Sequence, residues 1–197
     1  MVKLLHMECL KVEDRWVGGS QGWYSKRWQR LSGCGPTNAA LMAWYLAQAK
    51  PEYAALCDVG VRSKDDFLRV MNDMFGYVKP GVQGVNHAAK FARGMETYAG
   101  KRGLPLQLDW METRKNLFYA EPFLLEALQR DLPVAFLNLH SGNQPQLDAW
   151  HWMTIIAFDP DSALVHCCDQ GKIVKFSLRQ WHKTSKLGGH FATIHQQ

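Results

Sequence analysis

Cys34 is the residue of this chain whose type and surroundings most clearly suggest chemistry. It lies in the segment SGCGPTN at residues 32–38, directly before an apolar run that begins at Ala39. Gly, Pro and Thr ahead of such a run are typical of a helix start, so we expect the thiol at a helix N-terminus. The free N–H groups and the dipole at that end of a helix stabilise anions, and a thiolate is an anion. The segment therefore predicts a nucleophilic cysteine, which needs a base beside it.

Among the eight histidines of the chain, His151 is the best placed to be that base. It begins a predicted strand at residues 151–158, directly after a polar loop at 140–149, so its ring can face a cleft. His140, which ends the preceding predicted strand, is the alternative base. A base of this kind also needs an acidic or amide side chain that orients the imidazole.

Asp169 is the predicted orienting residue. His151 lies nine positions before Pro160 and Asp169 nine positions after it. If a turn near residue 160 joins two antiparallel strands, the two side chains return to the same end of the pair. The competing interpretation is that Asp169 only begins the hairpin turn at residues 169–171.

An oxyanion donor is expected just upstream of the thiol. Gln29 lies five residues before Cys34 and is our choice, and the backbone N–H of Cys34 is the second donor. Gln21, which follows a glycine-rich loop, is the alternative. The walls of the cleft are expected to include some of the tryptophans Trp23, Trp28, Trp110, Trp150 and Trp152.

The elements that must position these residues fall into two groups. Residues 1–33 look largely irregular. Helices are predicted at 36–48, at 64–75 after a capping box that begins at Ser63, and at 86–101. After Gly103, the predicted strands are 104–110, 133–139, 151–158, 163–168, 172–177 and 190–194, with short helices at 121–130, where Pro122 lies in the first turn, and at 178–182. Helices that precede antiparallel strands predict an α+β fold.

Composition limits the class of protein. A chain of 197 residues, 47% hydrophobic, is expected to form one domain over residues 1–197. The net charge of +5 is spread along the chain, without a basic run or a zinc-finger or RNA-binding signature, so we predict no nucleic-acid partner. No apolar run is long enough for a membrane span, and the first ten residues make a poor signal peptide.

The cysteines argue against disulfides and against a metal site. Five irregularly spaced cysteines do not form a disulfide framework, so we expect reduced thiols and a cytoplasmic protein, or one exported by a signal-independent secretion system. A metal set of His166, Cys167, Cys168 and His182 is conceivable, but adjacent cysteines in a strand do not easily face one ion. No cofactor and no metal are predicted.

The segment from Gly33 to Met42, GCGPTNAALM, resembles the Cys-Gly-Pro-Ser/Thr motif of papain-like cysteine peptidases of the bacteriocin-leader-processing type, the peptidase C-thirty-nine-like domains. The segment from His151 to Asp159 is similar to the strand that begins with histidine in that family, and residues 176–181 are similar to its closing segment. The resemblance implies a papain-like fold and a Cys34–His151–Asp169 triad. The family's glutamine lies six residues before the cysteine, where this chain has Trp28.

Together these features predict a thiol-dependent hydrolase that cleaves a peptide amide through an acyl-enzyme on Cys34, with a peptide or protein as substrate. The same residues serve amidases, deamidases and acyltransferases, including secreted effectors and toxins, because all of these pass through a thioester. A catalytically inactive papain-like binding module is the alternative from another class. The sequence does not specify the substrate or the oligomeric state.

Overall fold

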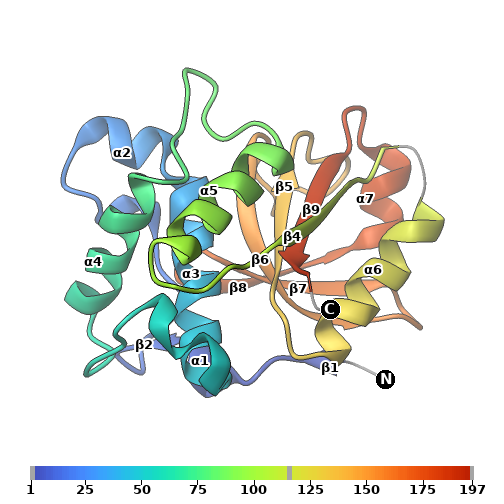
Figure 1. The fold of residues 1–197 in the computed structure, drawn as a ribbon. Coiled ribbons are helices and arrows are strands. Elements are labelled where there is room, and N and C mark those ends of the chain that lie inside the picture. Colours follow the sequence, from blue (N-terminus) through green and yellow to red (C-terminus); the bar gives the residue numbers. More distant parts are fainter. Residues whose placement is uncertain (1–2, 115–116, 196–197) are drawn as a thin grey trace.

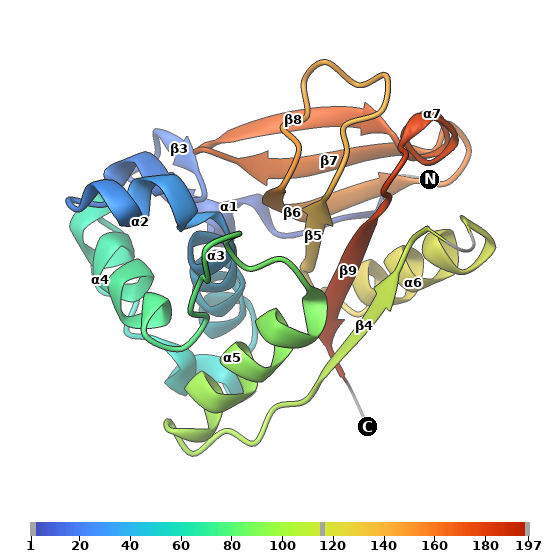
Figure 2. The same cartoon turned by 90° about the horizontal axis from the view of Figure 1, so that it is seen from above.

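The computed structural model describes residues 3–114 and 117–195, and its central element is helix α3 (Cys34–Ala49). Every residue from Gly35 to Leu46 is buried, which is the expected result for a helix that is apolar on all sides. α3 packs against strand β6 (His151–Asp159) on one side and against helix α4 (Lys64–Phe75) on another (Figure 2). The predicted helix at 36–48 is confirmed, and it begins two residues earlier, at the thiol itself.

Helices and strands are segregated, as Figures 1 and 2 show. Two further helical elements, η2 (Pro51–Leu56) and α5 (Ala88–Gly100), lie between α3 and the sheet strands in the sequence. α4 begins with the predicted capping box, in which Ser63 accepts a hydrogen bond from the N–H of Asp66 and the Asp66 carboxylate accepts one from the N–H of Ser63. This exchange fixes where α4 starts.

The prediction that residues 1–33 are largely irregular is wrong for the part of this segment that the structure describes. Six short elements lie there: β1 (Lys3–Leu4), α1 (Met7–Leu10), β2 (Lys11–Val12), β3 (Trp16–Val17), η1 (Gln21–Trp23) and α2 (Arg27–Ser32). The hydrophobic pattern of the sequence does not predict α2, because its two large apolar residues, Trp28 and Leu31, are exposed. A helix without a buried face has no apolar period to detect.

The second half forms one antiparallel sheet with the strand order β4-β9-β5-β6-β7-β8, and β1 also pairs with β6. Its strands, besides β6, are β4 (Leu108–Glu112), β5 (Val134–Asn138), β7 (Leu164–Asp169), β8 (Lys172–Ser177) and β9 (Gly189–Ile194). The helices of this half are α6 (Leu117–Gln129) and α7 (Leu178–Thr184). The α+β class, with helices and an antiparallel sheet, is confirmed.

Two boundaries in this half differ from the expected ones. β4 lies about four residues later than the predicted strand, because it is placed by its pairing with β9 rather than by its own alternation. α6 begins at Leu117, so Pro122 lies inside the helix and not in its first turn. Within the described part of the chain, no helix combines the length and the apolar character that crossing a bilayer requires.

Candidate active site

The thiol of Cys34 lies at the first residue of α3 because two helices meet there. Gly33 joins α2 to α3, and a Cβ on this glycine would come within 2.3 Å of the carbonyl oxygen of Gln29 and 2.6 Å of the Tyr24 ring. Only glycine allows so close an approach. Gly33 is also the N-cap of α3 and has no side chain with which to cap it. The start of α3 is therefore open toward a bound anion.

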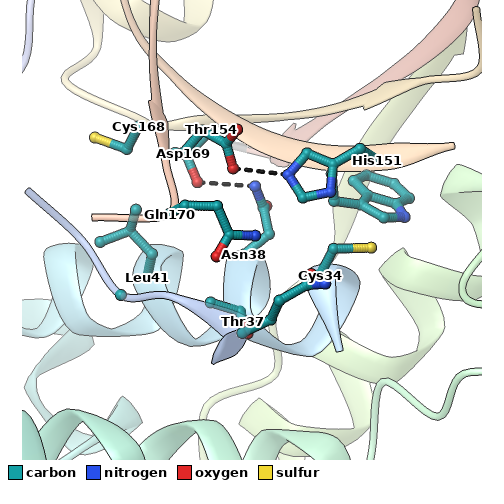
Figure 3. A pocket seen from close by; sticks show the side chains of 12 residues that line it. Cys34, Thr37, Asn38, Leu41, His151, Thr154, Cys168, Asp169 and Gln170 are labelled. Carbon is teal, nitrogen blue, oxygen red and sulfur yellow. Dashed lines mark hydrogen bonds and ion pairs between the residues drawn. The ribbon is translucent and has the colours of Figure 1, made fainter. Parts of the chain in front are cut away.

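His151 begins β6 and faces the thiol, as predicted. Its Nε2 lies 2.7 Å from Oδ1 of Asp169 (Figure 3), and its ring and Cys34 line the same small cavity. Because Nε2 is engaged with the carboxylate, Nδ1 is the ring nitrogen left for the sulfur. The His151 and Asp169 side chains are only 9% and 12% exposed. The structure thus brings the three predicted residues together around one small cavity.

Burial and charge oppose each other at His151. Burial disfavours the imidazolium and lowers the pKa, but the hydrogen bonds and charges of Asp169 and Cys34 outweigh it and raise the pKa to about 10. His151 is therefore protonated near neutral pH. A protonated imidazole beside a thiol is the proton donor that an acyl-transfer site requires.

Symmetry about Pro160 would place Asp169 directly opposite His151. The observed strand register differs from this arrangement. Thr154 pairs with Cys168, and a bulge interrupts the β6–β7 ladder between Ile155 and Ala157. One residue further along this ladder, Asp169 is level with Met153, so it is a diagonal neighbour of His151 rather than its direct partner. Diagonal neighbours are within reach of long side chains, which explains the 2.7 Å hydrogen bond.

The structure does not bring Gln29, the predicted oxyanion donor, to the small cavity at Cys34. Its amide Nε2 lies 3.4 Å from Oδ1 of Asn72 on α4, and Gln29 does not line the cavity at Cys34. The Gln29 side chain thus lies on the side of α2 that faces α4. The alternative, Gln21, does line that cavity.

One hydrogen bond positions the side-chain amide of Gln21 and leaves the second N–H of that amide available. Its Nε2 donates one hydrogen to the carbonyl of Arg30 at 2.8 Å, and this nitrogen carries a second hydrogen. The cavity that Gln21 shares with Cys34 and His151 holds only about 20 Å³, enough for a group the size of one water or one oxyanion. The only sequence signal for Gln21 was its place after a flexible glycine loop.

A larger groove opens on another side of the thiol. It has a volume of about 370 Å³ and is lined by Trp28, Leu31, Ser32, Cys34, Val82, Gln83, Gly84 and Trp150. Four of these are large apolar side chains with half or more of their surface exposed. Of the tryptophans expected in the cleft, Trp28 and Trp150 lie in this groove, and Trp152 lines the small cavity. Trp23 and Trp110 instead pack against Trp16 and His87.

The other sequence candidates have structural roles. Nδ1 of His140 accepts hydrogen bonds from the backbone N–H groups of Gly142 and Lys186, so this ring holds a loop and is not the base. All five cysteines are free. His166, Cys167, Cys168 and His182 do not form a cluster close enough to bind one ion among the described residues. Nε2 of His182 instead contacts the carbonyl of Thr113.

No known family model matches the chain, and no curated protein matches it. The geometry of the site is therefore the ground for any functional assignment.

Proposed function

We propose that this protein is a thiol-dependent hydrolase with a papain-like arrangement, which cleaves a peptide amide through an acyl-enzyme on Cys34. The observation that supports the proposal best is that Cys34 lines one small cavity with the hydrogen-bonded pair His151–Asp169 and also borders an open groove. A nucleophile, an oriented base and a carboxylate in this order are the minimum that acyl transfer needs.

The proposed reaction has two halves. The Cys34 sulfur attacks the carbonyl carbon, and the carbonyl electron pair moves to the oxygen, which accepts hydrogen bonds from the Cys34 N–H and from Gln21. The C–N bond then breaks, and the amine leaves with the proton of His151. Water next gives a proton to His151 and attacks the thioester, which releases the acid and restores the thiolate beside the imidazolium.

The apolar residues that line the groove favour a substrate with a bulky apolar side chain next to the scissile carbonyl. Trp28, Leu31, Val82 and Trp150 are 50%, 68%, 96% and 52% exposed, and they surround the space beside the thiol. Exposed apolar side chains gathered in one groove mark a binding site. Amidase, deamidase and acyltransferase reactions share the first half of the mechanism and differ in the amine or the acceptor.

An activated ester tests the proposal without knowledge of the natural substrate. The wild-type protein is mixed with nitrophenyl esters of N-acetylated phenylalanine, leucine and aspartate. We expect a burst of nitrophenol close to one equivalent per chain, a matching acyl adduct by intact mass, and preference for the apolar esters. Cys34→Ala is the matched variant and is expected to give neither the burst nor the adduct.

Two results would contradict the proposal. A burst that persists in Cys34→Ala would exclude this thiol as the nucleophile. The absence of any adduct on the folded wild-type protein would favour the inactive binding module.

A further inference from the structure

A second cluster of side chains that can bind ligands lies where α5, β4 and β9 meet. His87 is the N-cap of α5, Glu112 ends β4, and His190 lies at the start of β9. Glu112 and His190 are paired across the β4–β9 ladder, so their side chains are neighbours. One nitrogen or oxygen atom from each of the three lies within 4.8 Å of the others.

The His190 side chain is buried and has one ring nitrogen without a hydrogen-bond partner among the described residues. The residue is only 5% exposed, and among the atoms of the described residues its Nδ1 has no hydrogen-bond partner. A buried polar atom without a partner costs free energy. In the tautomer that is protonated at Nε2, Nδ1 carries a lone pair. A bound cation is one means of using that lone pair.

The cluster is also accessible. His87, Glu112 and His190 line a cavity of about 320 Å³, together with Asn86, Arg114, Leu139, Trp150, Leu187 and Gly189. A metal ion held by three protein ligands therefore has room for water or a small anion at a further position. Such an arrangement, three protein ligands and one open position, is typical of zinc sites that bind exchangeable ligands.

We propose that His87, Glu112 and His190 bind one divalent transition-metal ion, with zinc as the first candidate. Two imidazoles and a carboxylate suit zinc and its neighbours in the first transition row, and they do not suit calcium or magnesium. Zinc binds such atoms at roughly 2.0–2.2 Å, so two ligands of one ion are at most about 4.4 Å apart. Small rotations of the exposed Glu112 and the half-buried His87 bring the set within that limit.

Metal binding breaks one existing hydrogen bond of His87. Its Nδ1 now accepts the N–H of Ala89 at 3.1 Å, and its Nε2 lies 3.4 Å from Glu112. A metal ion on Nε2 moves the ring proton to Nδ1, so the contact with Ala89 is lost. Arg114 lines the same cavity, and its positive charge opposes a cation there. We therefore expect Arg114→Ala to bind the metal as tightly as the wild type or more tightly.

Cobalt titration of metal-free protein tests the proposal, and the Cys34→Ala background removes the thiol beside His151 as a competing ligand. We expect one equivalent of Co²⁺ per chain, with visible d–d absorption and no sulfur-to-cobalt charge-transfer band. Zn²⁺ should displace the bound Co²⁺ and raise the midpoint temperature of thermal unfolding. His87→Gln and Glu112→Gln, both at accessible positions, should weaken binding at least about tenfold. The matched control is His195→Gln, at an exposed histidine paired with Asp109.

The variants are first compared by circular dichroism without metal, so that a folding defect is not read as lost binding. Absence of binding to the folded Cys34→Ala protein would overturn the proposal. Binding that is equally tight in His87→Gln and Glu112→Gln would also overturn it, because the ion would then occupy other ligands. None of these readouts depends on hydrolase activity.

Discussion

His151 is the residue on which the proposed chemistry depends, because it is hydrogen-bonded to the carboxylate and shares a small cavity with the thiol. Burial alone would leave its ring neutral, and a neutral ring cannot deliver a proton to a departing amine. Asp169 and Cys34 reverse this and raise the pKa to about 10. The carboxylate thus has two effects: it fixes the ring through Nε2, and it keeps the proton on the ring.

At the same scale, the two glutamines near the thiol have different expected roles. Gln21→Ala removes the amide that shares the small cavity with Cys34, so we expect kcat to fall by about 10²–10³-fold. Gln29→Ala removes only a contact with Asn72, so it should leave kcat unchanged. Steady-state kinetics on the activated ester checks both. A large loss in Gln29→Ala with none in Gln21→Ala would reverse the assignment.

At the scale of elements, the site depends on how α3 is fixed to β6. Nδ2 of the buried Asn38 donates to Oγ1 of Thr154 at 2.9 Å, as Figure 3 shows. These residues lie one turn beyond Cys34 on α3 and three residues beyond His151 on β6. The bond therefore sets the spacing between the nucleophile and its base.

We expect Asn38→Ala to destabilise the fold by about 1–3 kcal/mol, because it leaves the Thr154 hydroxyl buried without a donor. Chemical denaturation measures this, and a double-mutant cycle with Thr154→Ala isolates the bond. Asn72→Ala, at an exposed asparagine on α4, is the control and should change stability by less than about 0.5 kcal/mol. Equal effects of the two variants would show that the Asn38 bond does not stabilise the fold.

The capping box of α4 gives a prediction that is independent of the site. Ser63→Ala removes the side chain that accepts the N–H of Asp66, so stability should fall by about 1 kcal/mol. Burst kinetics on the activated ester should not change, since α4 supplies none of the residues that line the small cavity or the apolar groove. A loss of the burst in the folded variant would mean that the start of α4 is coupled to the thiol.

Elements with a strong local signal were predictable, and elements placed by distant partners were not. The capping box identified the start of α4, and the apolar run identified α3. The exposed helix α2 and the strand β4 lacked such signals. The same distinction holds in the site. Cys34, His151 and Asp169 sit at element ends that can be read from the sequence, whereas Gln21 reaches the thiol through loop packing that no local pattern encodes.

At the scale of the whole molecule, His151 makes stability depend on pH. Its pKa in the folded protein, about 10, exceeds the ordinary value of 6.5. The stabilisation is therefore complete below about pH 6.5 and is lost as the pH rises through 10. Half-buried Cys57, whose pKa is raised to about 12 mainly by desolvation, adds a further loss above about pH 9. The free energy of unfolding should fall from pH 6.5 to 10.

Asp169→Asn separates the contribution of His151 from that of Cys57. Without the carboxylate the His151 pKa should fall, so the advantage of the wild type over Asp169→Asn should be largest near pH 6.5 and shrink toward pH 10. Urea unfolding at several pH values measures the difference. A difference that grows with pH would mean that His151 is not held in the protonated form.

The most direct test of the proposed site is the rate of thiol labelling. Burial raises the pKa of Cys9, Cys57, Cys167 and Cys168, so these four thiols should react slowly near neutral pH. With limiting iodoacetamide at pH 7 and peptide mapping by mass spectrometry, we expect Cys34 to be labelled first and His151→Ala to slow this labelling at least about tenfold. Labelling of Cys34 at the rate of the similarly half-buried Cys9, or at a rate that His151→Ala leaves unchanged, would contradict an activated nucleophile at this position.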